Sequence, residues 1–150
     1  MTDIETLLAI EEIRQLKARY FRGVDTKDAA VLRAVFTDDA ETDFREESPD
    51  RDPALLQRDP DGFVRNTLYI LEGIATAHAG FNPEIALLSP TEATGRWSMT
   101  DRLWTEDATL NRLPFKTLEG WGAYHDTYRK TASGWRIAST RLARTKLIFG

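Results

Sequence analysis

The sequence Tyr20-Phe21-Arg22-Gly23-Val24-Asp25 closes a long amphipathic segment that we expect to form the first helix of the fold. Thr2 and Glu5 are spaced as a capping box, which predicts that the helix begins just after Thr2. Apolar side chains then recur at helical spacing, at Ile4, Leu7, Leu8, Ile13, Leu16, Tyr20 and Val24. The pattern therefore places a phenol, Tyr20, and a carboxylate, Asp25, where a core helix ends.

Two shorter helices are predicted after this one. Asp28 is a suitable N-cap for a helix that includes Phe36 and ends near Thr37-Asp38-Asp39, and residues 40–44 fit a short strand. Asp61-Gly62 opens a third helix, with its apolar side at Phe63, Val64, Thr67, Leu68, Ile70 and Leu71. The intervening residues 45–61 are rich in Asp, Glu and Pro, which is typical of a solvated loop. A lid over a pocket is the alternative interpretation of this acidic segment.

The pattern changes to that of strands after Gly73. Segments rich in Thr, Ile, Trp and Tyr are separated by Asn82-Pro83, Ser89-Pro90 and Ser133-Gly134. We expect strands at residues 75–78, 84–88, 91–105, 118–130 and 135–148. Helices followed by antiparallel strands predict the α+β class, with the helices covering one face of a curved sheet. Such a sheet leaves a pocket at its open end.

Bulk composition limits the classes of function. The chain has 150 residues, enough for one domain over residues 1–150, with 41% hydrophobic and 29% charged residues. Its net charge of −4 and lack of a basic stripe give no reason to expect a nucleic acid or membrane partner. The absence of Cys excludes disulfides and thiolate sites, and the acidic N-terminus does not resemble a signal peptide. We expect a cytoplasmic protein.

His78 is the principal candidate for a general base. It is one of two histidines and lies just before Ala79-Gly80, and an imidazole can exchange a proton near neutral pH without a cofactor. A structural or surface histidine is the alternative, and His125, among alternating aromatic residues, is equally ambiguous. Tyr20 and Asp25 could also be ordinary core and turn residues.

Asp101 and Arg144 are the charged residues expected on buried faces of strands. Alternation places Asp101 on the side of Trp97, Met99 and Leu103, and Arg144 on the side of Ala138, Thr140 and Leu142. A buried carboxylate must be paired, and Arg102, Arg141 and Arg144 are its possible partners. Arg144 would either hold this carboxylate or bind an oxygen of a ligand. We expect no metal site and find no phosphate loop, dinucleotide fingerprint or nucleophile elbow.

Four stretches of the sequence together resemble a known family. They are Ile13–Asp25, Ala77–Ile85, Ala93–Leu103 and Gly134–Leu142. In this order they are similar to the SnoaL-like domains of the nuclear-transport-factor-two-like superfamily. Within that superfamily, the pattern is most similar to bile acid 7α-dehydratase and, more distantly, to scytalone dehydratase.

The resemblance implies a cone-shaped α+β barrel with a buried pocket, usually dimeric or trimeric, and often with cofactor-free lyase or isomerase chemistry. Tyr20, Asp25 and His78 match the tyrosine, aspartate and histidine of the dehydratases. Asp101 matches an aspartate of the long strand, Tyr124 matches a pocket tyrosine, and Arg144 matches an arginine of the last strand. Many relatives read His-His-Gly and then a polar residue where this chain has His78-Ala79-Gly80-Phe81, which implies a more apolar pocket.

These residues suggest an Asp25–His78 dyad that removes a proton, while Tyr20 and Arg144 stabilise a developing oxyanion. Asp101, Tyr124, Phe81 and Trp97 are expected to contact the substrate. The predicted reaction is dehydration, a related β-elimination or carbon–carbon cleavage of a hydrophobic, ring-containing hydroxylated small molecule. A polyketide-type cyclase or isomerase, a non-catalytic ligand-binding module and an assembly subunit are the alternatives. The partners expected are this substrate and further copies of the chain, as a homodimer or homotrimer.

Overall fold

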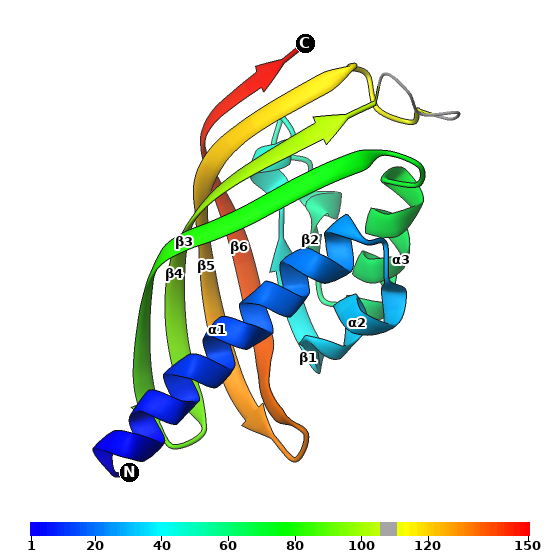
Figure 1. Cartoon of the computed structure of the whole chain (residues 1–150). Helices are drawn as coiled ribbons and strands as arrows, with labels where there is room; N and C mark the ends of the chain where they lie inside the picture. The colour runs from blue at the N-terminus through cyan, green and yellow to red at the C-terminus, as the bar shows by residue number, and fades with distance from the viewer. Residues whose placement is uncertain (106–110) are drawn as a thin grey trace.

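A computed structural model describes residues 1–105 and 111–150 of the chain. Three α-helices lie on one side of a curved sheet, which they partly enclose (Figure 1): α1 (Asp3–Asp25), α2 (Ala29–Ala34) and α3 (Pro60–Ile70). The strands are β1 (Phe36–Asp43), β2 (Leu56–Gln57), β3 (Ala75–Ser89), β4 (Glu92–Trp104), β5 (Thr117–Thr131) and β6 (Gly134–Phe149). Two 3₁₀ turns, Arg45–Glu47 and Pro53–Leu55, lie between β1 and β2.

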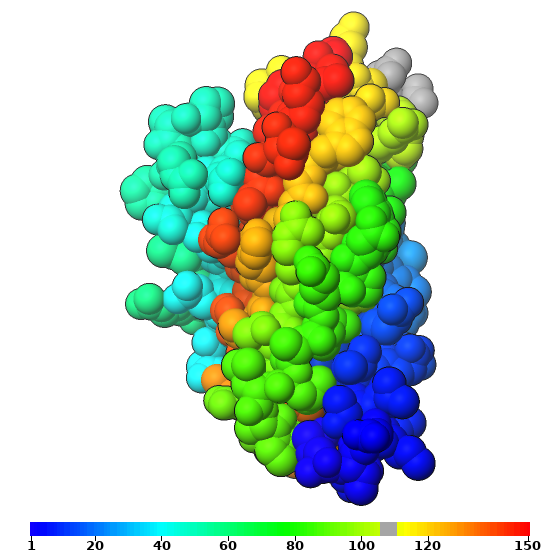
Figure 2. Space-filling view, turned by 90° about the vertical axis from the view of Figure 1, so that its left-hand side faces the viewer, coloured from blue at the N-terminus to red at the C-terminus, as the bar shows by residue number. Residues whose placement is uncertain are grey.

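The sheet is mixed and remains open. Its strand order is β2-β1-β6-β5-β4-β3, in which β3 to β6 form an antiparallel meander and β1 runs parallel to β6. Figure 2 shows the outer face, across which the four long strands run side by side. The predicted α+β class and curved mixed sheet are confirmed, but the sheet does not close into a barrel. None of the helices in the described part of the chain has the length and apolarity needed to cross a membrane.

Helix α1 packs along the concave face of the sheet, as its sequence predicts. Thr2 Oγ1 accepts a hydrogen bond from the Glu5 backbone N–H at 3.1 Å, and the Glu5 side chain accepts one from Thr2 N–H. Ile13, Leu16 and Tyr20 are buried in the core. The apolar side chains of the first two turns are exposed instead, because that end of α1 lies at the end of the sheet (Figure 1): Ile4, Leu7 and Leu8.

Several predicted boundaries are wrong. Asn82-Pro83 does not separate two strands, because Asn82 adopts a left-handed φ of 51° and the chain continues as β3 with a shifted register. Helix α3 begins at Pro60, since Asp59 caps it by accepting a hydrogen bond from Gly62 N–H at 3.0 Å. The helix expected to run through Phe36 ends at Ala34, and the strand expected to begin at residue 40 begins at Phe36.

A bulge in β6 changes which residues face the core. Ser139 and Ile137 pair with consecutive residues of β5, so Ala138 is left out of the pairing. Trp135 and Ile137 are buried before the bulge, whereas Thr140 and Leu142 are buried after it. The bulge thereby puts the even-numbered positions 140–144 of β6 on the concave side, before a second shift in register at Thr145.

Candidate active site

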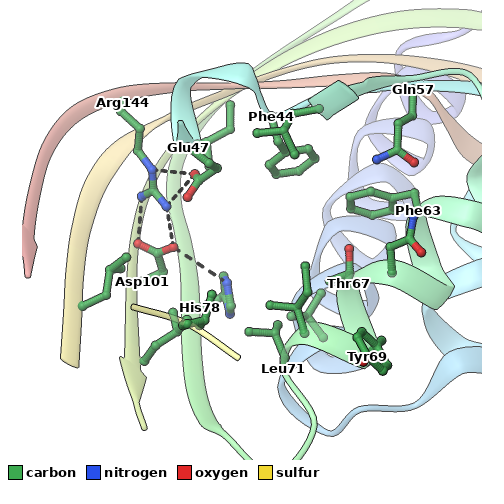
Figure 3. Close-up of a pocket in the computed structure, with 18 of the residues that line it drawn as sticks. Phe44, Glu47, Gln57, Phe63, Thr67, Tyr69, Leu71, His78, Asp101 and Arg144 are labelled. Atoms are coloured by element: carbon green, nitrogen blue, oxygen red, sulfur yellow. Dashed lines mark hydrogen bonds and ion pairs between the residues drawn. The ribbon is translucent and has the colours of Figure 1, made fainter. Parts of the chain in front are cut away.

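A cavity of about 590 Å³ lies between the concave face of the sheet and the helices (Figure 3). This volume is within the range of small-molecule sites. Most of its wall is apolar and comes from helices, strands and the segment between β1 and β2, including Val24, Phe44, Leu55, Phe63, Leu71, Leu103 and Leu142. Residues 45–61 thus supply part of the wall. This favours the interpretation of the segment as a cover over the pocket rather than as a purely solvated loop.

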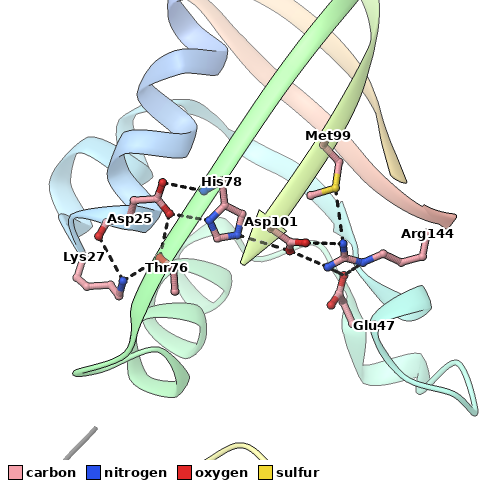
Figure 4. Close-up of polar contacts among 8 residues, drawn as sticks. All are labelled: Asp25, Lys27, Glu47, Thr76, His78, Met99, Asp101 and Arg144. Atoms are coloured by element: carbon pink, nitrogen blue, oxygen red, sulfur yellow. Dashed lines mark hydrogen bonds and ion pairs between the residues drawn. The ribbon is translucent and has the colours of Figure 1, made fainter. Parts of the chain in front are cut away.

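Asp25 and His78 meet at one side of this cavity. Asp25 is the last residue of α1, and its Oδ1 lies 2.6 Å from Nδ1 of His78 on β3 (Figure 4). Asp25 also accepts hydrogen bonds from the His78 backbone N–H and the Thr76 hydroxyl, both at 2.9 Å. An ionised Asp25 can only accept, so Nδ1 carries the proton, and in the neutral imidazole Nε2 of His78 presents its lone pair to the cavity.

Asp25 is held in its ionised form. Burial alone would raise the pKa of this carboxyl, but hydrogen bonds from the His78 ring and backbone outweigh burial, and Thr76 adds to them. The net effect lowers the pKa of Asp25 below its ordinary value. The carboxylate can therefore fix the tautomer of His78 throughout the neutral range.

A second charged group lies beside the dyad on the same wall of the cavity, because Asp101 on β4 pairs with His78 on β3. Arg144 forms a two-pronged ion pair with Asp101, with both N–O distances at 2.8 Å, and Glu47 Oε1 lies 2.7 Å from its Nε and Nη2. Burial would lower the pKa of Arg144, but both carboxylates raise it above the ordinary value. Asp101 Oδ2 also lies 3.9 Å from Nε2 of His78. Asp25, His78, Asp101, Arg144 and Glu47 therefore form one continuous polar chain (Figure 4).

Gly120 on β5 makes room for the Asp101–Arg144 pair. A Cβ at this position would collide with Oδ1 of Asp101 and Nη1 of Arg144. A side chain here would displace the ion pair, which lies directly over the β5 backbone.

Two tyrosines form the floor of the cavity over a buried lysine. Tyr20 and Tyr124 meet edge to face with ring centroids 5.7 Å apart. Lys17 Nζ lies 3.7 Å from the Tyr124 ring centroid and 2.8 Å from Oδ2 of Asp126. Burial raises the pKa of both phenols, so each remains a hydrogen-bond donor at neutral pH.

Comparison with known proteins agrees with this fold. Residues 5–141 match the family described as SnoaL-like domain. The chain belongs to that family. Its structure is similar to a putative scytalone dehydratase from Novosphingobium aromaticivorans, with a TM-score of 0.81, 21% identity, and coverage of 99% of this chain and 92% of the other.

Two other solved structures are similar over comparable lengths. A hexachlorocyclohexane dehydrochlorinase (LinA, type 2) has a TM-score of 0.80 and 16% identity, covering 99% of this chain and 93% of its own. The Kfla4162 protein from Kribbella flavida has a TM-score of 0.79 and 22% identity, covering 95% of each chain. At these identities the likeness extends to the fold, and the chemistry must be argued from this SnoaL-like chain's own residues.

Most of the predicted site residues meet in the cavity. Its lining includes Tyr20, His78, Asp101, Tyr124 and Arg144, and Asp25 lies directly behind His78. Their roles in catalysis or binding stay predictions.

Phe81 and Trp97 were expected to contact the substrate, but neither lines the cavity. Strand alternation turns Phe81 outward, where it is 43% exposed. Trp97 is buried, and its Nε1 donates to the Tyr128 hydroxyl at 3.0 Å.

The sequence reasoning missed Lys17, Asp126 and Glu47. Lys17 is fully buried. Its position three residues before Tyr20, in the apolar stripe of the helix, could have indicated this burial from the sequence. Asp126 alternates with Tyr124 and Tyr128 and accepts hydrogen bonds from the Tyr128 and Thr140 hydroxyls. Glu47 had no distinguishing signal, since it is one of many acidic residues in its segment. In residues 1–105 and 111–150, no group of three potential metal ligands is close enough to hold an ion.

The dyad predicts a specific tautomer of His78. In ¹⁵N NMR spectra near neutral pH, we expect Nδ1 to be protonated and Nε2 to be bare, because Asp25 accepts the Nδ1 proton. Asp25→Asn should lose this preference and give a mixture of tautomers. His125, which does not line the cavity, is the internal reference. A wild-type His78 that is already a mixture would contradict the dyad.

Proposed function

We propose that this SnoaL-like protein is a lyase that eliminates water from a hydrophobic, ring-containing hydroxylated compound without a cofactor. The observation that carries the proposal is the 2.6 Å contact between Asp25 Oδ1 and Nδ1 of His78, which leaves Nε2 free at the wall of an apolar cavity. A base oriented in this way can remove a proton from a carbon next to a carbonyl group.

The elimination would use His78 twice. Nε2 takes the proton from the carbon, the electron pair forms the C=C bond, and the C–O bond to the leaving hydroxyl breaks. The imidazolium then returns the proton to the departing hydroxide, which leaves as water. Because Asp25 and Asp101 flank the two ring nitrogens, they stabilise the transient positive charge. Tyr20 or Tyr124 would donate to the enolate oxygen.

Arg144 has a different role in this proposal from the one expected from the sequence. All three nitrogens of its guanidinium are engaged by carboxylates. Arg144 would therefore position Asp101 rather than bind the oxyanion itself. This assignment follows the alternative in which the arginine holds a protein carboxylate.

The names of the similar structures are consistent with elimination chemistry. A dehydratase removes water, and a dehydrochlorinase removes hydrogen chloride, so both names describe loss of a proton and a leaving group. An isomerase is the second candidate, because the same Nε2 could return the proton to a different carbon of an enolate. Both reactions require the base and the oxyanion donor, and they differ only in whether a leaving group is present.

A panel of cyclic ketones tests the proposal. We expect the protein to convert 3-hydroxycyclohexanone or its fused-ring analogues to conjugated enones, followed by ultraviolet absorbance and by loss of water in mass spectra. The 4-hydroxy isomers are the matched controls, since their hydroxyl is not placed for β-elimination. Conversion of 3-cyclohexenone alone would indicate the isomerase, and no protein-dependent product from any β-hydroxy ketone would contradict the lyase.

A further inference from the structure

Two carboxylates, those of Asp101 and Glu47, contact the single positive charge of Arg144. Asp101 alone matches its charge with two parallel hydrogen bonds at 2.8 Å. Glu47 adds a second carboxylate from the turn Arg45–Glu47, and its Oε1 contacts the remaining edge of the guanidinium at 2.7 Å. Arg144 would otherwise attract an anionic ligand, but these two carboxylates already occupy its guanidinium.

The cavity wall consequently has an excess of negative charge. Its described acidic and strongly basic residues are two carboxylates, Asp101 and Glu47, and one guanidinium, Arg144. Asp25 lies behind His78 and adds to the negative potential, although Lys27 Nζ, 3.3 Å from the Asp25 carbonyl oxygen, partly offsets it. A carboxylate, phosphate or sulfate on a ligand would be repelled, and the apolar wall would weaken the screening of that repulsion.

The turn that carries Glu47 is anchored on both sides. Arg45 forms a two-pronged pair with Asp43 at 3.0 and 2.8 Å. Glu46 accepts a hydrogen bond from the Arg144 backbone N–H at 3.2 Å and lies 3.9 Å from Arg141. Glu47, whose side chain is 30% exposed, is therefore held against Arg144 by its neighbours as well as by its own ion pair.

We infer that Glu47 is a specificity-determining residue that excludes anionic ligands from the cavity. It does so by occupying the exposed edge of Arg144 and by making the wall net negative. The inference rests on the proposed use of this cavity as the substrate site, and it narrows the substrate class to cyclic hydroxy ketones without carboxylate, phosphate or sulfate groups.

Binding of two matched probes tests this assignment without any chemistry. Cyclohexanecarboxamide and cyclohexanecarboxylate share one skeleton and differ in charge, and their affinities are measured by NMR titration at neutral pH and low salt. We expect the wild type to bind the amide roughly tenfold more tightly than the carboxylate, and Glu47→Gln to remove most of that preference. Glu46→Gln removes the same charge from the same turn but not from the guanidinium, and should leave the preference within about threefold of wild type.

The inference would be overturned by equal or tighter binding of the carboxylate by the wild type, by an unchanged preference in Glu47→Gln, or by an equal loss of preference in Glu46→Gln. Failure of both probes to bind the wild type would also overturn it. The lyase proposal is judged separately by the ketone panel. If the protein shows the expected charge preference but converts no β-hydroxy ketone, the inference about the ligand class stands and the lyase proposal fails.

Discussion

Replacing His78 with alanine is expected to lower turnover of a β-hydroxy ketone by roughly 10²–10⁴-fold, the usual contribution of a positioned general base. The imidazole is the only described group in the cavity wall that combines a bare nitrogen with a carboxylate fixing its tautomer. Its loss removes the proton acceptor and the donor to the leaving hydroxyl together. The measurement is initial rate against substrate concentration, which separates kcat from KM.

Two controls distinguish chemistry from a general loss of structure. His78→Ala should bind cyclohexanecarboxamide within about threefold of the wild type, because only one side chain of a large apolar wall is shortened. His125→Ala should keep its rate, since His125 is outside the cavity wall. A His78→Ala protein that retains more than about a tenth of wild-type turnover would rule out His78 as the base.

Replacing Lys17 with methionine is expected to cost about 3–5 kcal/mol of unfolding free energy, as for other broken buried ion pairs. The Lys17 and Asp126 side chains have no exposed surface, and their charged atoms are 2.8 Å apart. Burial lowers the pKa of Lys17, and Asp126 partly offsets that effect. Methionine fills the space but leaves Asp126 with hydroxyl donors only, those of Tyr128 and Thr140. Urea unfolding followed by circular dichroism measures the loss.

The partner and the surroundings of Lys17 supply the controls. Lys17→Met combined with Asp126→Asn should recover part of the loss, because no unpaired charge is then buried. Arg14→Met on the same helix should change stability by less than about 0.5 kcal/mol, since its pair with Glu11 is solvent-exposed. A loss below about 1 kcal/mol for Lys17→Met would mean that Asp126 finds other compensation when the ammonium is removed.

Local patterns in the sequence predicted most of the fold. The capping box at Thr2 and Glu5 set the start of α1, and two-residue alternation placed Asp101 on a buried face of β4. These features depend on residues close together in the chain, so they can be derived without knowing the packing. The break expected at Asn82-Pro83 was wrong for the same reason. Only the pairing with β4 shows that the strand accommodates a bulge there.

The site was partly predictable, because the family resemblance indicated which residues to bring together. It placed Asp25 beside His78, although 53 positions separate them, and it included Tyr20, Asp101, Tyr124 and Arg144 in one site. The resemblance was less useful for Phe81 and Trp97, whose orientation depends on the side of each strand that faces inward. Strand alternation alone could have suggested that Phe81 and His78 lie on opposite faces.

The sequence by itself determined the helices, the strand-rich second half and the candidate acid and base. The tertiary structure decided which charges meet. The sequence contains many carboxylates that could pair with Arg144. Among the carboxylates of the described residues, the β6 bulge, the Gly120 backbone and the turn Arg45–Glu47 bring only those of Asp101 and Glu47 into contact with its guanidinium. Lys17 and Asp126 are 109 positions apart, and no local pattern links them. Ion pairs depend on distances of a few ångströms in space, which only the register and curvature of the assembled sheet fix.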